Sequence, residues 1–148
     1  MSNRSDLPFA ITREVRDGCL CLHVQRAARS LARRYDEALR PVRLTNGQFS
    51  LLMSLNREAA ASMGSISGLL AMDRTTLTAN LKPLMRRGLV TVAVDPVDKR
   101  SRVLTLTASG RSLLAAALPL WRGAQAATER LIGRSTPDRL RTDLRALS

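Results

Sequence analysis

The chain has 148 residues, 45 % of them hydrophobic and 3 % aromatic, and a formal net charge of +12. This length predicts one domain over residues 1–148, and the composition favours an aliphatic, helical core over a sandwich or barrel. Because the sequence has no apolar run of membrane-spanning length and no apolar segment typical of a secretion signal, we expect a cytoplasmic protein without a membrane partner.

Helix signals dominate the first half of the chain. Thr12 is expected to cap a long first helix over 13–40, which Pro41 ends. Residues 45–48, TNGQ, form a capping box, so a second helix is expected to begin near residue 46.

Two further helices and a hairpin follow. Ser62 is expected to cap a short third helix, and Asp73 a fourth that stops at Gly88. The alternating, β-branched segments 89–94 and 102–107 predict two strands joined by a charged turn.

The chain is expected to end in two helices. Thr107 caps the fifth helix, which runs to about Gly133 and bends at Pro119, and Pro137 lies in the first turn of the sixth. The predicted order is therefore ααααββαα. It indicates a mainly α fold with a small β-hairpin, the arrangement of a winged helix-turn-helix.

The fourth helix has two chemically distinct faces. On a helical wheel, Leu77, Leu81 and Leu84 form its inner face. The opposite face carries a hydroxyl, a small residue and cations, namely Thr75, Ala79, Lys82 and Arg86, with Thr76 and Pro83 at its edge, and Arg74 lies at the helix start. These side chains suit a helix in a DNA major groove, although a solvated polar face would also look this way.

The hairpin turn is basic. Lys99, Arg100 and Arg102 lie at or beside its tip, where an arginine can enter a narrow minor groove. A basic tip alone is more often plain surface. A helix-turn-helix followed by a basic wing within 40 residues is more specific than either part, and the combination favours binding of double-stranded DNA.

The net charge is weaker evidence than this arrangement. Between residues 73 and 102 there are seven basic and three acidic residues, a net +4 of the total +12. Of the 24 basic residues 22 are arginine, a bias that a GC-rich genome also produces. A non-specific architectural or RNA-associated protein, and a winged helix used only for protein contacts, therefore stay open as alternatives.

The chain resembles the MarR family of bacterial winged-helix regulators over about residues 13–148. The run DRTTLTANLKPLMRRGLV…DPVDKRSRVLTLTASGR carries most of the resemblance, and LTNGQFSLL (44–52) matches the entry to the family's second helix. It implies a homodimer formed through helices 13–40 and 107–148, with a DNA-binding lobe over 45–106. It also implies a regulator, most often a repressor of a pseudo-palindromic operator, whose DNA affinity a small ligand lowers.

The resemblance also assigns roles to residues. Thr75, Thr76 and Ala79 match the positions that read the major groove, and Lys82 matches a phosphate contact. Arg100 matches the minor-groove arginine of the wing, and Asp73 matches the acid that orients that arginine. Pro83 departs from the pattern, because it removes a backbone donor inside the helix. It predicts a bend or a displaced last turn, and Arg86 and Arg87 lie beyond it.

The first helix resembles the organic-hydroperoxide-sensing branch of the same family. Cys21 falls at the reactive cysteine of that branch, and Tyr35 matches a tyrosine that holds the thiolate. The second supporting tyrosine is replaced here by Asn46. A buried structural cysteine is the alternative, and on one helix Cys19 and Cys21 would point about 200° apart, too far to pair.

Catalysis and metal binding are not expected. His23 is the only histidine, and the two cysteines lie close to it on one predicted helix, which is too few ligands for a zinc site. The sequence holds no nucleophile–base set or phosphate-binding glycine loop, so we expect no enzyme and no cofactor. In relatives, the region of His23 binds small aromatic or acidic ligands; a simple hydrogen-bonded surface histidine is the alternative.

Overall fold

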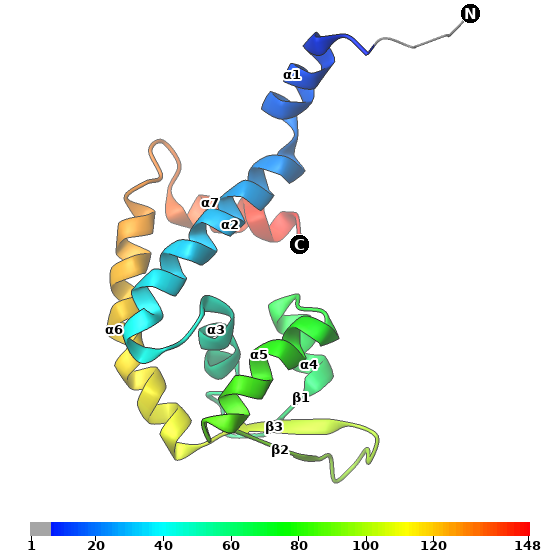
Figure 1. Cartoon of the computed structure of the whole chain (residues 1–148), viewed down its shortest axis with the longest axis vertical. Helices are drawn as coiled ribbons and strands as arrows, with labels where there is room; N and C mark the ends of the chain where they lie inside the picture. Colours follow the sequence, from blue (N-terminus) through cyan, green and yellow to red (C-terminus); the bar gives the residue numbers. More distant parts are fainter. Residues whose placement is uncertain (1–6) are drawn as a thin grey trace, which may run out of the picture. The chain divides into compact units, whose positions relative to one another are not determined.

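The computed structural model describes residues 7–148, which divide into two compact units between Arg34 and Tyr35. The protein is mainly helical with one small antiparallel sheet, as the sequence predicts (Figure 1). Residues 1–6, which the predicted single domain includes, lie outside the described part. Within residues 7–148, none of the helices has the length and apolar character that a membrane span requires.

The predicted first helix is in fact two helices, α1 (Phe9–Gly18) and α2 (Leu20–Leu39). The prediction of one helix over 13–40 is wrong because the backbone turns to an extended conformation at Cys19, directly after the glycine that ends α1. Glycine weakens a helix by about 1 kcal/mol relative to alanine. Thr12 is not the cap either, since α1 begins earlier, after the extended Pro8.

A short 3-10 turn, η1 (Arg40–Val42), ends α2 at the predicted proline. The chain then passes through Arg43 in the left-handed conformation, with φ 57°. Helix α3 (Asn46–Ser54) begins with the predicted capping box, in which Thr45 Oγ1 accepts from Gln48 N and Gln48 Oε1 accepts from Thr45 N. This cap satisfies two N–H groups that the first turn leaves without partners.

The next two helices also begin where their caps predict. Ser62 caps α4 (Met63–Leu70), and Asp73 caps α5 (Arg74–Arg86). Helix α5 is continuous through Pro83, and Gly88 follows it with φ 69°, a conformation in which glycine is unstrained.

The sheet has three strands in the order β1-β3-β2, all antiparallel. The predicted strands appear as β2 (Val90–Val94) and β3 (Arg102–Leu106), with Val92 opposite Leu104. Strand β1 (Ala61–Ser62) was not predicted, because two residues show no periodicity. It pairs with β3 and anchors the start of α4 to the sheet.

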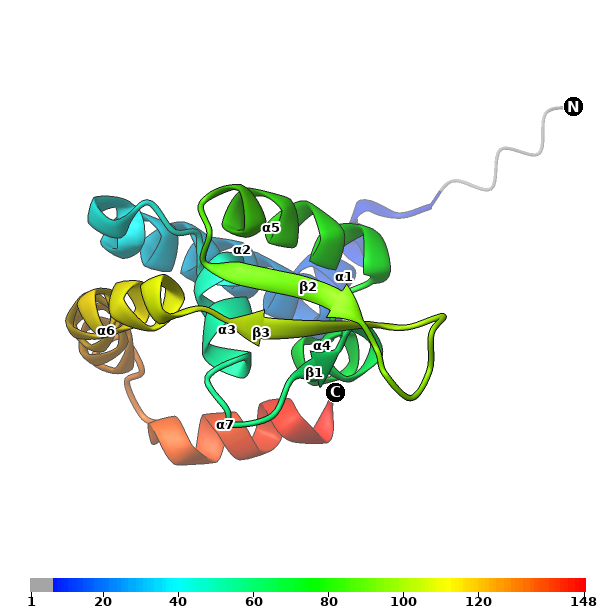
Figure 2. The ribbon, with the colours of Figure 1, turned by 90° about the horizontal axis from the view of Figure 1, so that it is seen from below.

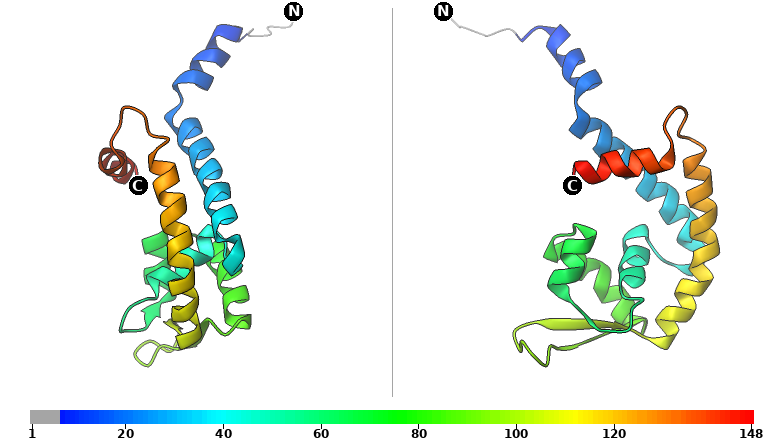
Figure 3. Two further views of the ribbon diagram at one scale, coloured as in Figure 1. Left: turned by 90° about the vertical axis from the view of Figure 1, so that its left-hand side faces the viewer. Right: turned by 180° about the vertical axis from the view of Figure 1, so that it is seen from behind.

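Two more helices complete the chain. Thr107 caps α6 (Ala108–Glu129), and Thr136 caps α7 (Pro137–Ala146). Helix α6 ends four residues before the predicted Gly133 and continues through Pro119. Figure 3 shows α6 curving along its length, as expected where a proline removes one bond of the helical ladder.

The core of the second unit joins α3, α4, α5 and the sheet with the first half of α6. Its fully buried side chains are aliphatic: Leu39, Leu51, Leu52, Leu55, Ile66, Leu77, Leu84, Leu104 and Leu106. Trp121 stacks on Phe49 with ring centroids 6.2 Å apart. At Gly110, a Cβ atom would come within 2.4 Å of the Leu89 carbonyl oxygen, so only glycine allows α6 to approach the sheet this closely.

Candidate nucleic-acid interface

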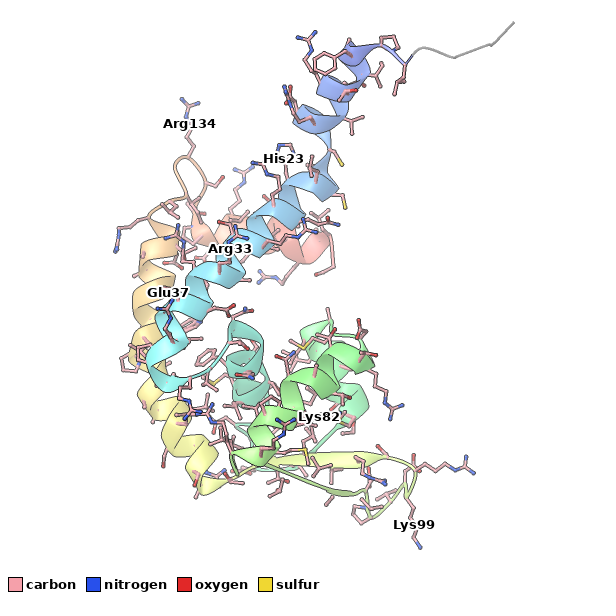
Figure 4. The ribbon with its side chains drawn as sticks, viewed as in Figure 1. His23, Arg33, Glu37, Lys82, Lys99 and Arg134 are labelled. Carbon is pink, nitrogen blue, oxygen red and sulfur yellow. The ribbon has the colours of Figure 1, made fainter. Side chains whose placement is uncertain are left out.

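Helix α5 presents the two faces that the helical wheel predicts. Leu77, Leu81 and Leu84 are buried. The opposite side chains are exposed: Thr75, Thr76, Ala79, Lys82 and Arg86, together with Arg74 at the helix start. Figure 4 shows Lys82 projecting from α5. The three leucines therefore fix the rotation of the helix, and that rotation leaves two threonines, one alanine and three cations free to meet a ligand.

The start of α5 is held by Asp73. Its Oδ1 accepts from Thr76 N at 2.7 Å, and this hydrogen bond is the main reason why the pKa of the Asp73 carboxyl lies below its ordinary value. Among residues 7–148 no ion pair links Asp73 with Arg100. The role of Asp73 in orienting the wing arginine therefore stays a prediction, whereas its role as a helix cap is confirmed.

A shallow groove of about 410 Å³ follows the exposed face of α5. It is lined by Arg74, Thr75, Thr78, Ala79 and Lys82. Thr78 is absent from the predicted contact residues, although it lies between Thr75 and Lys82 on the helix surface. Its Oγ1 donates to the Arg74 carbonyl at 2.8 Å, which satisfies the hydroxyl within the helix.

The hairpin tip is shaped by two carboxylates. Asp95 Oδ1 accepts from Val97 N at 2.8 Å, and Asp98 Oδ1 accepts from Arg100 N at 3.0 Å. Such bonds from an aspartate to the backbone two residues on define Asx turns, which stabilise a loop without regular pairing. The hairpin of β2 and β3 extends past α4 and α5 (Figure 2). Lys99 points away from its tip (Figure 4).

The wing and α5 meet at a hollow of about 330 Å³. Arg74 from α5 and Arg100 and Asp98 from the turn line it, beside Met63, Gly64 and Ser67 of α4 and Ser101. The structure thus brings together two predicted DNA-binding arginines that are 26 residues apart in the sequence. Lys99 on the same turn and Arg102 at the start of β3 are exposed but do not line the hollow. Two guanidinium groups at one concave surface favour an anionic ligand.

A separate cavity of about 410 Å³ lies between α3, α4 and α6. Its walls are mostly apolar: Phe49, Ser50, Met53, Ser54, Leu69, Leu70, Leu118 and Trp121. The stacked pair of Phe49 and Trp121 forms one side. No charged side chain is among these residues. His23, the sequence candidate for a ligand pocket, is not one of them either, and its Nδ1 lies 2.8 Å from the Cys19 carbonyl oxygen.

The predicted redox residues have separate partners. Cys21 is exposed, and its Sγ accepts from Gln25 Nε2 at 3.3 Å. The Tyr35 hydroxyl donates to Gln125 Oε1 of α6. Asn46 donates to Asp36 through its backbone N and its Nδ2. Because Cys19 lies in the break before α2, the premise that both cysteines share one helix is wrong.

Within residues 7–148 no three His, Cys, Asp or Glu side chains are grouped as metal ligands. The acidic side chains near the candidate interface accept hydrogen bonds from backbone N–H groups, as Asp73, Asp95 and Asp98 do. What the interface offers is therefore an array of cations and hydroxyls on a rigid helix and hairpin.

Comparisons with known proteins agree with this geometry. A family model described as the MarR family matches residues 44–101. The HTH-type transcriptional regulator TtmR of Methylorubrum extorquens is 37 % identical over 97 residues, which cover 66 % of this chain and 50 % of TtmR. The chain therefore spans about half the length of that curated relative.

Solved structures match over more of the chain. The transcriptional regulator MosR of M. tuberculosis in complex with DNA is 42 % identical, covers 87 % of this chain and 92 % of MosR, and has a TM-score of 0.78. The repressor CouR bound to a 23-mer DNA duplex is 30 % identical, with a TM-score of 0.78, over 97 % of this chain and 99 % of CouR. These relatives are named as transcriptional regulators, in agreement with the expectation that the chain is not an enzyme.

Proposed function

Because the chain belongs to the MarR family, we propose that it is a DNA-binding transcriptional regulator that reads double-stranded DNA with α5 and the β2–β3 wing. The observation that carries this proposal is the shared hollow of Arg74 and Arg100. It places the start of the exposed helix face beside the wing, and in this proposal one lobe thereby meets two neighbouring grooves.

Individual roles follow from side-chain chemistry. In this proposal the short side chains of Thr75, Thr76 and Ala79 contact base edges or a thymine methyl in the major groove. Arg100 enters the minor groove, and Asp73 holds the start of α5. The remaining cations neutralise phosphates: Arg74, Lys82, Arg86, Lys99 and Arg102.

The active form in this proposal is a homodimer. Apolar side chains are exposed on α1 and α7 in the single chain, among them Phe9 at 70 %, Val15 at 56 % and Leu144 at 41 %. Pairing of such helices between two copies would bury these side chains and place two lobes on a pseudo-palindromic site. Sedimentation that shows a monomer at micromolar concentration would contradict this part of the proposal.

Repression relieved by a small ligand completes the proposal. The cavity between α3, α4 and α6 supports a ligand with an aromatic or aliphatic body, because its walls are apolar and uncharged. This lining favours the aromatic over the acidic ligand expected from the sequence. A ligand there that binds one arrangement of the helices more tightly would shift the population toward it.

The cavity has a direct test. We expect Trp121→Leu to weaken binding of naphthalene, used as a neutral aromatic probe, and to leave DNA affinity without the probe unchanged. Calorimetry on the wild type and the variant measures the first effect, and gel retardation the second. Equal binding of the probe by both proteins would exclude this cavity as its site.

The DNA-binding proposal is tested by competition at fixed salt. We expect the wild type to prefer a palindrome near its own gene over random DNA by ~10³-fold or more. Arg100→Ala should lower operator affinity by roughly ten- to hundredfold, since a base-reading arginine contributes about 1–3 kcal/mol. Lys99→Ala is the matched control on the same turn and should have a smaller effect, equal on all DNA. A steep salt dependence without operator preference would favour the architectural alternative.

A second candidate is regulation by oxidation of Cys21. Its support is that Cys21 is a free, exposed thiol whose Sγ accepts a hydrogen bond from Gln25 Nε2. Organic hydroperoxide should then lower operator affinity in the wild type but not in Cys21→Ser. Unchanged binding by the treated wild type would exclude this candidate.

A further inference from the structure

The side chain of Arg87, the residue directly after α5, is not part of the exposed face of that helix. Its side chain reaches the junction between α2 and α3, where Nη1 donates to the Arg43 carbonyl at 2.6 Å and Nη2 donates to the Val42 carbonyl at 3.2 Å. Its sequence neighbour Arg86 is exposed. Two adjacent arginines therefore have different surroundings. Arg87 binds a segment that lies 44 residues earlier in the sequence.

The carbonyls that Arg87 binds lie at the end of η1. Terminal carbonyls of a helical turn have no partner within the turn and carry partial negative charge. Arg43 adopts φ 57° there, and Leu44 N donates to the Leu39 carbonyl at 3.4 Å, which closes the junction. A guanidinium that donates to two such carbonyls satisfies both and complements their charge. Arg87 thus fixes the junction from which α3 starts.

The last turn of α5 needs such an anchor. Pro83 has no N–H, so the Ala79 carbonyl lacks its usual helical partner. Beyond Pro83, the turn keeps the backbone bonds from Arg87 N to the Pro83 carbonyl and from Leu89 N to the Leu84 carbonyl. The guanidinium adds bonds to a different element. It therefore restrains the part of α5 whose own ladder is interrupted.

We propose that Arg87 is a positioning residue for DNA binding: it anchors the last turn of α5 to the α2–α3 junction and so sets the orientation in which the base-reading Thr75, Thr76 and Ala79 of α5 meet the DNA. The proposal rests on the proposed function, since it concerns the same DNA surface. Arg87 itself makes no DNA contact in this account, because its Nη1 and Nη2 donate to the carbonyls of Arg43 and Val42.

The test compares Arg87→Gln with the matched variant Arg86→Gln by titrating operator and random DNA over a series of salt concentrations. We expect Arg87→Gln to lower operator affinity by roughly tenfold or more, as loss of charge-assisted hydrogen bonds predicts. Its affinity for random DNA and its salt slope should stay at the wild-type values. Arg86→Gln should weaken both DNAs alike and reduce the salt slope by about one.

Stability is separated from positioning by two controls. Titrations are made at a temperature at which circular dichroism shows each variant folded, so that a change in the operator-to-random ratio is not explained by unfolding. Arg87→Lys, which keeps the charge but loses the two-carbonyl fork, should recover part of the operator affinity. If Arg87→Gln does not fold, the same comparison is made with Arg87→Lys, which should show the smaller loss of operator preference.

Two results would overturn the proposal. Unchanged operator affinity in Arg87→Gln would show that the anchor is not needed, and a salt slope reduced as in Arg86→Gln would show that Arg87 contacts phosphate directly. If instead the wild type shows no preference for operator over random DNA, the proposed function fails. Failure of the proposed function is distinguishable from failure of the Arg87 proposal, because it is seen with the wild type alone.

Discussion

The winged-helix lobe and the N-terminal helices have similar apolar patterns in their sequences but differ in whether those apolar side chains are buried. The lobe buries its leucines from α3, α4, α5 and the sheet around one core. Helix α1 buries no residue, and α2 buries only Leu39. Both regions carry apolar stripes at helical spacing. The difference shows that periodicity identifies a helix face, but whether its partner is in the same chain must come from the structure.

The largest expected contrast between the two regions is in core truncation. Leu77→Ala should lower the free energy of unfolding by about 2–5 kcal/mol, because Leu77 is fully buried and its removal leaves a cavity. Val15→Ala on α1 should change it by about 0.5 kcal/mol or less. Urea denaturation followed by the fluorescence of Trp121, the only tryptophan, reports on the lobe. Equal losses in both variants would contradict the contrast.

A matched pair of glycines sharpens the same comparison. Gly110→Ala should destabilise the lobe by about 1–3 kcal/mol, because the new methyl group would clash with the Leu89 carbonyl. Gly18→Ala meets no atom within 4 Å, and it should raise helix content instead. Circular dichroism and urea denaturation measure both. A neutral Gly110→Ala would show that α6 can move away from the sheet.

The N-terminal helices should respond through dimerisation rather than through folding of the lobe. Ile11 and Val15 are four residues apart on α1, so they share a face, and both are exposed in the single chain. Replacing both by serine should raise the dimer dissociation constant roughly tenfold or more, since each truncation removes buried apolar area. Sedimentation equilibrium measures this. Dissociation constants equal to the wild type would remove α1 from the interface.

The smallest expected effect concerns the cap of α5. The pKa of Asp73 is lowered in the folded state by the hydrogen bond from Thr76 N, so its contribution to stability is complete above about pH 4 and declines as pH falls through the folded-state pKa. Asp73→Ala should lower the melting temperature by about 2–4 °C at pH 7.

Asp73→Asn separates the cap from the charge. Asparagine caps helices as well as aspartate does, so this variant should melt near the wild type at pH 7 but lose the acid-dependent part. If it also loses operator affinity, the charge of Asp73 orients the wing as the family resemblance implies. A melting temperature of Asp73→Asn as low as that of Asp73→Ala would contradict the capping account.

Predictions from sequence were accurate where the determining contacts are local. Thr45, Ser62 and Asp73 cap α3, α4 and α5, and each cap accepts a hydrogen bond from the N–H group three residues later. A helical wheel was sufficient to find the buried face of α5. The prediction of one helix over 13–40 failed at Cys19, because the single glycine before Cys19 was not weighed against the longer apolar pattern on both sides.

The rest depends on distant contacts. Strand β1 exists because β3 supplies partners about 40 residues away. The hollow that joins Arg74 and Arg100 depends on how the wing folds back toward α4. The inward direction of Arg87 follows from the carbonyls of Val42 and Arg43, and no local pattern distinguishes it from Arg86.

The most direct test of the central claim is competition between operator and random DNA for the wild-type protein. The intergenic DNA upstream of its own gene is footprinted, and the protected sequence is then competed against random duplex at physiological salt. The account predicts two protected half-sites about one helical turn apart and a preference of ~10³-fold or more. Equal affinity for random DNA, or no retardation at low salt, would contradict it.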